Sequence, residues 1–309
     1  MKKLLLLPAV LLCFAGAAGA QVAAPSLAIA PPNSSRPSNP AVLPWAGPSR
    51  VAVGSGSREQ LRTTAAGVTS PRASGGFTRA QARWVGERFA LAVGTLNVAS
   101  TLDPAIGGGS ATAEFSFASL GFRLNDSLSF GIGQKGRRDL TPTADDTFAL
   151  VSYGVVWQPV LNIFLGFSTG DESVREVSGS ATLDASRSVT NYGVAWQVKG
   201  GGGGMHLGFY AETREDTTAF TLKPKEQVTG FVAEISFGPV NLSFDVSDTA
   251  FSDAGGTALR DEETQVYRAA WTFGGGLTVS AATRSSKRNF PNGNVDTIDL
   301  NSIGLAWLF

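Results

Sequence analysis

Cysteine and histidine are almost absent from this sequence, which contains only Cys13 and His206. Because Cys13 falls inside a predicted export signal, the mature chain is predicted to contain no disulfide and no thiolate metal site. Charged residues make up only 16% of the chain, below the roughly 25% that is typical of soluble domains. The formal net charge is zero, which argues against a nucleic-acid partner.

Long hydrophobic runs are also missing once the first twenty residues are passed, so no later segment is predicted to be a transmembrane helix. Residues 1–20 predict a secretory signal peptide, with Lys2 and Lys3, an apolar stretch over Leu4–Phe14 and small residues at Ala18–Ala20. Export, low charge and the lack of a spanning helix together favour a β-barrel in the outer membrane of a Gram-negative cell.

The carboxy-terminal residues Thr297–Phe309 predict a strand that closes such a barrel. Large apolar side chains recur at every second position, which places them on one face of the strand. On an outer-membrane barrel that face meets lipid. The pattern is similar to the signal that the barrel-assembly machinery reads, and it consists of Ile303, Leu305, Trp307 and Phe309.

The alternation predicts an all-β, transmembrane antiparallel barrel of about fourteen strands in residues 49–309. Twelve is the alternative number, because the first two strands, Arg50–Ser57 and Gly75–Arg83, are weakly patterned and a long loop is expected between them. The segment 21–48 is rich in Pro, Ala and Ser and predicts a plug or linker.

Short connections are predicted to alternate with long polar ones, as periplasmic turns alternate with outer loops in membrane barrels. The long connections are expected at Gly170–Arg187, Arg214–Glu226, Ser252–Glu263 and Ser285–Val295. An aromatic residue precedes each short turn, which predicts one interfacial girdle formed by Trp157, Trp196, Phe237, Trp271 and Trp307.

The face opposite the apolar one is predicted to line the lumen, and its residues are mostly small. Small and polar residues are expected there more than large apolar ones. The inward polar residues are expected to pair across the lumen or to reach water, and they are Gln158, Gln197, His206, Tyr210, Glu212, Arg214, Glu234, Asp245, Arg268 and Arg284.

Two glycine motifs match enzyme patterns, but their surroundings do not fit. Gly166–Gly170 reads G-x-S-x-G, which requires a strand-to-helix elbow and a histidine base. Gly131–Gly136 reads G-x-G-x-x-G, which requires a following helix. Both are predicted to be strand or loop sequence, so the chain is predicted to be no enzyme, with no catalytic residue, cofactor or metal site.

Several stretches resemble the FadL family of outer-membrane transporters for long-chain fatty acids and other hydrophobic compounds. Asn39-Pro40-Ala41 resembles the Asn-Pro-Ala motif near the mature amino terminus of that family. Residues 48–54 are similar to its first strand, residues 83–94 to its turn into the third strand, residues 122–131 to a later hairpin and residues 302–309 to its end. The chain departs from the family in being shorter, with Ser38 and Val42 where an aromatic residue and a glycine are usual.

The resemblance implies a fourteen-stranded barrel whose lumen is closed by a plug near residues 21–47. It also implies a lateral exit at a kink in the third strand, for which Gly94 is the candidate, although packing space is an equal explanation for this glycine.

The implied function is passage of hydrophobic, fatty-acid-like small molecules, with outer-membrane lipid and the barrel-assembly machinery as the other partners. Two alternatives remain open: a diffusion porin for small polar solutes, and a structural or assembly barrel that transports nothing.

Overall fold

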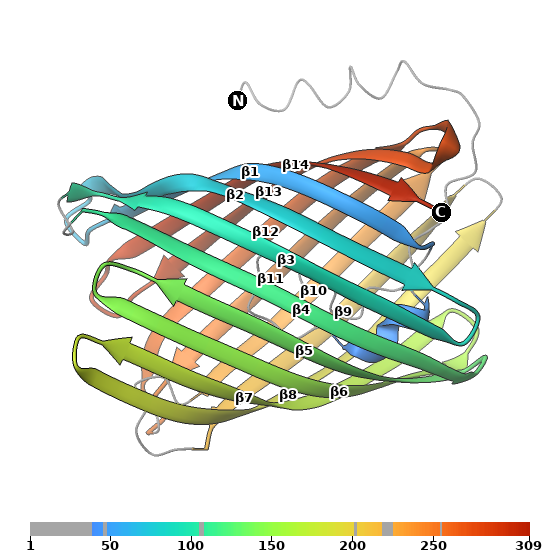
Figure 1. The fold of residues 1–309 in the computed structure, drawn as a ribbon, viewed down its shortest axis with the longest axis horizontal. Helices are drawn as coiled ribbons and strands as arrows, with labels where there is room; N and C mark the ends of the chain where they lie inside the picture. Colours follow the sequence, from blue (N-terminus) through green and yellow to red (C-terminus); the bar gives the residue numbers. More distant parts are fainter. Residues whose placement is uncertain (1–38, 46–47, 105–107, 201–202, 218–224, 254) are drawn as a thin grey trace.

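A computed structural model describes residues 39–45, 48–104, 108–200, 203–217, 225–253 and 255–309. The predicted signal peptide and most of the predicted plug lie outside these residues. The fold is a closed barrel of fourteen antiparallel strands with a short 3₁₀ helix, η1 (Pro40–Trp45), inside it (Figure 1). The strands are β1 (Arg50–Thr63), β2 (Thr69–Val85), β3 (Phe89–Leu102), β4 (Ser110–Asn125), β5 (Leu128–Leu140), β6 (Ala144–Val160), β7 (Ile163–Ser178), β8 (Ala181–Gly200), β9 (Gly203–Asp216), β10 (Lys225–Phe237), β11 (Val240–Ser252), β12 (Ala258–Thr272), β13 (Leu277–Asn289) and β14 (Val295–Leu308).

Each strand pairs with its sequence neighbours, and the barrel closes between β1 and β14. Arg50 pairs with Leu308 at one end of this seam and Thr63 pairs with Val295 at the other. The count of fourteen is therefore confirmed, and the first two strands are full members of the sheet. Among the described residues, no helix has the length and apolar character needed to cross a membrane.

The strands extend further than their apolar patterning predicted, so the connections predicted to be long are shorter than expected. The predicted loop Gly170–Arg187 is strand up to Ser178 and again from Ala181. The predicted loop after Ser57 is the continuation of β1 to Thr63. Side chains still alternate between the two faces in these extensions, but the outer face is polar there too. The extensions therefore have the amino-acid composition of a loop.

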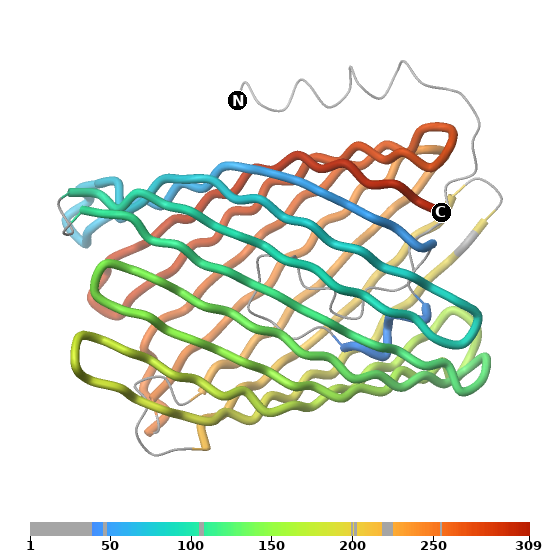
Figure 2. The backbone as a smooth tube through the Cα atoms, in the orientation of Figure 1, coloured from blue at the N-terminus to red at the C-terminus, as the bar shows by residue number. Residues whose placement is uncertain are grey.

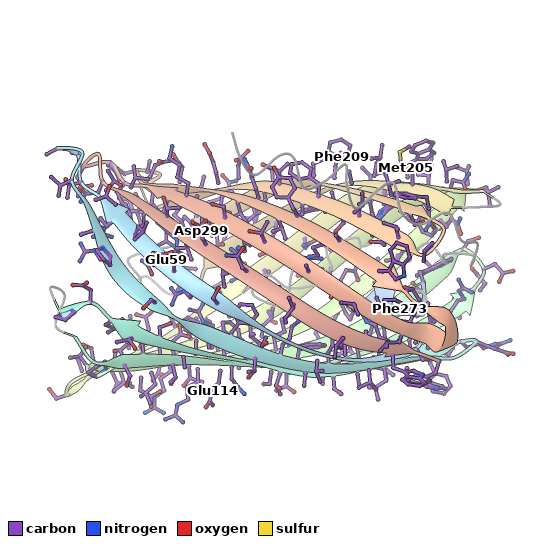
Figure 3. The ribbon with its side chains drawn as sticks, turned by 90° about the horizontal axis from the view of Figure 1, so that it is seen from above. Glu59, Glu114, Met205, Phe209, Phe273 and Asp299 are labelled. Atoms are coloured by element: carbon purple, nitrogen blue, oxygen red, sulfur yellow. The ribbon has the colours of Figure 1, made fainter. Side chains whose placement is uncertain are left out.

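The outer face of the barrel divides into an apolar belt and a polar region (Figure 3). On β7, Leu165 and Phe167 are exposed within the belt, and the following outward positions are Thr169, Asp171 and Ser173. Figure 3 shows Met205, Phe209 and Phe273 toward one end of the barrel and Glu59, Glu114 and Asp299 toward the other. The belt lies at the end where β14 finishes, as a lipid-facing band bordered by a water-exposed wall would.

Four of the five residues of the predicted aromatic girdle are exposed on this belt, and the fifth, Trp271, is half-buried. Trp157, Trp196, Phe237 and Trp307 are 39–58% exposed although they are large and apolar. Each stands near the last position of its strand or the first of the next turn, at the same end of the barrel. Three exposed tyrosines lie further from this end of the barrel, and they are Tyr153 on β6, Tyr192 on β8 and Tyr267 on β12. Aromatic residues at both borders of an apolar band are typical of membrane barrels.

The inner face carries the small residues that the alternation predicted, and the glycines among them make room for large neighbours. A methyl group on Gly56 would collide with the ring of Phe77, and one on Gly230 would collide with the ring of Tyr210. Both rings therefore lie flat along the wall, over a glycine of the adjacent strand.

Candidate functional site

The amino-terminal segment enters the barrel and docks through Asn39. Its side-chain amide donates hydrogen bonds to the backbone carbonyls of Val155 and Phe167, both at 3.1 Å. Its carbonyl oxygen accepts a hydrogen bond from the backbone N–H of Ala41 at 3.0 Å, which caps the first turn of η1. Asn39, Pro40 and Ala41 are all buried, and Figure 2 shows η1 inside the barrel toward the end where β14 finishes.

Three glycines form the floor on which η1 rests. Gly121, Gly131 and Gly154 face each other across β4, β5 and β6. A Cβ atom on any of them would lie less than 3.0 Å from an atom of Asn39, Pro40, Ala41 or Pro44. Glycine is therefore required here for close approach of two backbones. The G-x-G at residues 131–133 lies within β5 and serves this contact.

Trp45 fixes the other end of η1. Its indole N–H donates to the hydroxyl of Ser129 at 2.7 Å, and that hydroxyl donates to the carbonyl of Ala41 at 2.6 Å. The guanidinium of Arg123 lies 4.1 Å from the indole ring centroid, and Phe164 packs edge-on at 5.3 Å. Phe164 and η1 residues form one buried apolar cluster with Val156 and Ala195.

Large apolar side chains also face the lumen, and none of them was predicted from the sequence. The buried ones on the inner wall include Phe77 on β2, Leu96 on β3 and Leu150 on β6. Phe115 and Phe117 on β4 and Phe148 on β6 share this face, as the strand registers require. These residues were missed because they stand in the weakly patterned β2 or in the polar ends of strands, where the outer face is no longer apolar.

A buried charge network spans β7 to β10. Arg214 lies 3.0 Å from Glu212, 3.6 Å from Glu172 and 4.0 Å from Glu226. Arg187 lies 3.6 Å from Glu172 and 3.9 Å from Asp216. Lys135, on β5, interacts electrostatically with Glu212 and Glu172. Since removing one partner of a buried pair leaves an uncompensated charge, these residues brace the four strands together.

The other predicted lumen residues also lie on the inner face. Tyr210 donates to Asp245 at 3.0 Å, Asn241 donates to Glu234 at 2.6 Å, and Arg284 is 3.7 Å from Glu262. Arg268 faces the lumen between Glu234 and Asp245. Gln197 is buried, and Gln158 lies beside a register shift at the end of β6.

His206 differs from its expectation. It was expected to be solvated or hydrogen-bonded, but it is fully buried, and neither ring nitrogen has a hydrogen-bond partner among the described residues. Its strand places it between Gln197 of β8 and Glu234 of β10. A Cβ atom on Gly208 would lie 3.6 Å from its Nε2.

Gly94 shows no break in pairing. β3 pairs with β2 and β4 through this residue without a register shift. A methyl group on Gly94 would lie 2.5 Å from the ring of Phe117 and 2.9 Å from the carbonyl oxygen of Ala80. The structure therefore shows packing space at Gly94, and a lateral exit there stays a prediction for another state of the wall.

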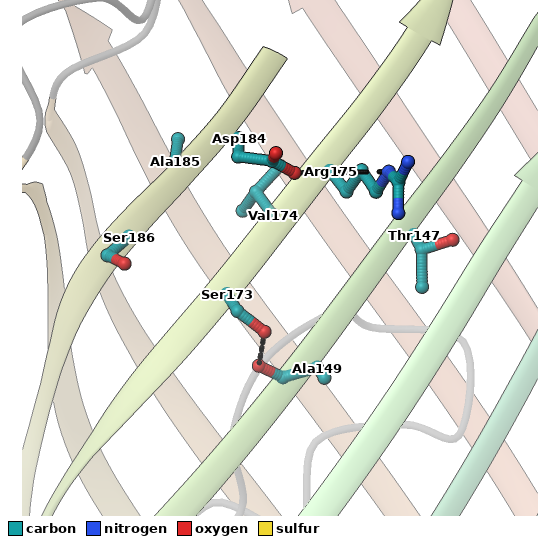
Figure 4. A pocket seen from close by; sticks show the side chains of 8 residues that line it. All are labelled: Thr147, Ala149, Ser173, Val174, Arg175, Asp184, Ala185 and Ser186. Atoms are coloured by element: carbon teal, nitrogen blue, oxygen red, sulfur yellow. Dashed lines mark hydrogen bonds and ion pairs between the residues drawn. The ribbon is translucent and has the colours of Figure 1, made fainter. Parts of the chain in front are cut away.

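The enzyme-like motif Gly166–Gly170 lies in the middle of β7, where Ser168 is buried, and not at a strand-to-helix elbow. Among the described residues, no group of three His, Cys, Asp or Glu side chains is placed to hold a metal ion. A pocket of about 510 Å³ lies at the polar ends of β6, β7 and β8 (Figure 4). Arg175 and Asp184 border it, 3.9 Å apart and well exposed on the outer face.

The predicted assembly residues lie on the outward face of the last strand and at its end. Ile303, Leu305, Trp307 and Phe309 are 51–67% exposed and point away from the lumen. Leu305 and Trp307 stand opposite Val53 and Val51 of β1. Their role in assembly stays a prediction.

No family model and no curated protein sequence matches this chain. Solved structures do match in fold. A Pseudomonas aeruginosa FadL homologue aligns with a TM-score of 0.56 at 11% identity, covering 93% of this chain and 96% of its own. The chain has a FadL-like fold. The Ralstonia pickettii toluene transporter TbuX (0.57, 10%, 95% and 97%) and the Pseudomonas putida toluene transporter TodX (0.57, 11%, 93% and 98%) share this FadL-like fold.

Proposed function

We propose that this protein carries small hydrophobic compounds across the outer membrane through the lumen of its barrel. The observation that carries the proposal is the set of large apolar side chains on the inner wall of β2, β3, β4 and β6. A lumen filled only with water gains nothing from such residues. An apolar solute that leaves water for this wall gains about 0.8 kcal/mol for each buried methylene group.

The second element of the proposal is the docked η1 segment. It rests on β3 to β6 at the belt end of the barrel, so it narrows the lumen on that side. In a plugged transporter this segment and the residues before it would limit the flow of water and ions. The solved structures that share the fold include proteins described as toluene transporters and a monoaromatic hydrocarbon channel, which supports hydrophobic solutes of modest size. We extend the proposal to fatty-acid-like chains.

A diffusion porin for polar solutes is the alternative, and the charged inner residues favour it. The experiment that separates the two compares cells that lack the protein, cells that produce it and cells that produce a variant without residues 21–47. Uptake of labelled oleate and labelled toluene is measured beside single-channel conductance in planar bilayers.

Protein-dependent uptake of either compound, with low conductance that rises in the deletion variant, is the expected result. Uptake equal to that of empty cells, together with a steadily open conductance in the full chain, would establish the porin instead. If the protein produced no uptake and no conductance, the result would favour a structural or assembly barrel.

A further inference from the structure

We infer that the lumen contains an aqueous pathway selective for small inorganic anions, which follows the arginine-rich inner faces of β12, β13, β14, β1 and β2. We call these five inner faces the arginine wall. The inference goes beyond the proposed function, because it concerns the ions that pass through the barrel and not the hydrophobic solute.

The arginine wall is formed by other strands than those that hold η1. The helix packs on β3 to β6, and it also touches β7 and β8 through Asn39, Phe164 and Ala195. On that side of the lumen the glycine floor and the apolar cluster are covered by the helix. Water that passes η1 at the belt end is therefore expected to follow the arginine wall.

Arginines outnumber carboxylates in the outer half of this wall. Among the described residues, the carboxylates that the five strands turn to the lumen are Glu262 and Asp296. Arg58 and Arg260 are each repelled by Arg288. The arginines of this half are Arg58, Arg62, Arg260, Arg284 and Arg288. Their pairing with two carboxylates therefore leaves positive charge in excess.

Carboxylates of neighbouring strands reduce this excess without removing it. Asp139 on β5 attracts Arg58, but it also pairs with an arginine of its own strand. Glu226 on β10 attracts Arg260, but it also lies 4.0 Å from Arg214 of the network on β7 to β10. Each of these carboxylates is therefore shared between two guanidiniums.

The excess of positive charge continues to the belt end of the wall. Arg79 on β2 is repelled by Arg268 on β12, and Arg50 on β1 is repelled by both. Glu234 on β10 attracts Arg50 and Arg268, and Asp245 on β11 also attracts Arg268. Two carboxylates therefore face three arginines at this end.

Water reaches the arginine wall at both of its ends. The side chains of Arg62 and Arg288 are 27% and 29% exposed although they face the lumen. At the belt end Arg50, Arg79 and Arg268 are half-buried. A passage lined by one sign of charge concentrates ions of the opposite sign, and rings of arginine or lysine are typical of anion pores. The pathway should therefore pass chloride in preference to potassium.

The test places the full protein in planar bilayers of a zwitterionic lipid, with a gradient of potassium chloride across the membrane. The reversal potential measures the permeability of chloride relative to potassium. We expect a ratio of about three or more at low salt, and a lower ratio at high salt, where the charges are screened. A variant without residues 21–47 should conduct more and keep the preference. A preference for potassium, no preference at low salt, or no current in either protein would overturn the pathway.

Arg58→Gln and Arg79→Gln test the outer half and the belt end of the wall. Each should lower the permeability ratio about twofold. Arg138→Gln, on the exposed outer face, is the matched control and should leave the ratio unchanged. Semi-native electrophoresis shows whether each variant is folded. An unchanged ratio in both folded lumen variants would show that the wall does not select the ion.

Glu234→Gln changes the charge without removing an arginine. It keeps an oxygen that can accept a hydrogen bond from Asn241, and it should raise the preference for chloride. A lower preference in this variant would contradict the inference. Toluene uptake by cells that produce the same variants should stay nearly unchanged. Failure of the anion preference would therefore leave hydrophobic transport intact, and failure of uptake alone would leave the anion pathway intact.

Discussion

The ring of Phe117 lies against the backbone of Gly94 on the neighbouring strand, on the lumen side of the barrel. The two residues are register partners, and the absence of a side chain on one provides the volume that the other occupies. Packing of the Phe117 ring therefore explains why position 94 is a glycine. The backbone hydrogen bonding of β3 to its two neighbouring strands stays continuous at this position.

Gly94→Ala should therefore destabilise the barrel. Its methyl group would meet both the Phe117 ring and the carbonyl of Ala80, and overpacking of this kind typically costs about 1–3 kcal/mol. The measurement is the temperature at which the folded band of the barrel is lost in semi-native electrophoresis. Gly274→Ala is the control, because nothing lies within 4 Å of its Cβ position. If Gly94→Ala changed solute uptake at unchanged stability, the glycine would serve an exit and not packing.

Asn39→Asp should release η1 from the wall. The substitution keeps the shape of the side chain but replaces two donated hydrogen bonds with two oxygen–oxygen repulsions against the carbonyls of Val155 and Phe167. We expect a larger single-channel conductance and faster proteolysis of the amino-terminal segment, with the barrel itself intact.

Asn125→Asp is the matched control for this experiment. Asn125 uses its carbonyl oxygen to accept a hydrogen bond from the backbone N–H of Ser127, and aspartate preserves that contact. Its conductance should equal that of the unaltered protein. An unchanged conductance in Asn39→Asp as well would show that the Asn39 amide does not hold η1 in place.

Much of this architecture could be predicted from the sequence because one physical rule dominates it. Side chains on a strand alternate between lipid and lumen, so Leu165 and Phe167 identify a strand and its outward face together. The same rule cannot identify a strand beyond the belt, because outer-face residues there, such as Asp171 and Ser173, are as polar as those of a loop. The ends of the strands therefore could not be predicted.

The inner wall was less predictable than the outer one. The side chains that fit on the inner wall depend on the residues beside them on neighbouring strands, as the Phe77 ring fits beside Gly56. The register that pairs these strands cannot be read from a single sequence. The place of Arg79 on β2 also depends on closure of β1 onto β14, because a Cβ atom on Gly304 of β14 would lie 3.0 Å from its Nη2.

Asp296→Asn should weaken that closure. Asp296 accepts hydrogen bonds from Arg62, with an Nη2–Oδ2 distance of 2.7 Å, and the pair joins the last strand to the first. The carboxylate is nearly fully buried, so loss of its charge leaves Arg62 with a weaker partner, and we expect a loss of about 1–3 kcal/mol. Chemical unfolding in detergent measures it.

Asp145→Asn tests the same chemistry on the exterior. Asp145 pairs with Arg138 through two hydrogen bonds, but both side chains are exposed to water. Exposed pairs contribute little to stability because water screens them, so we expect almost no change in the unfolding midpoint. Equal effects of the two substitutions would show that Arg62 and Asp296 do not contribute specially to closure.

Removal of Phe309 should reduce assembly in cells more than folding in detergent. Phe309 is 65% exposed, and its backbone N–H donates to the carbonyl of Ser49. The exposed ring is therefore expected to contribute little to the stability of the folded barrel. We expect less folded protein in outer-membrane fractions and a nearly normal refolding yield from urea. Equal losses in both measurements would assign the residue to stability.

In an outer membrane, the height of the sheet would determine how much of this protein stands outside the lipid. A strand of 16 residues such as β7 is about 54 Å long at ~3.4 Å per residue, or about 40 Å tall when tilted by ~40°, whereas a lipid-facing band is about 25 Å tall. The part of the wall beyond such a band would be a hydrogen-bonded sheet, and the turn between β7 and β8 is as short as residues 179–180. Antibodies raised against the folded protein should recognise surfaces that disappear on unfolding, and short peptides from the turns should be poor substitutes for them.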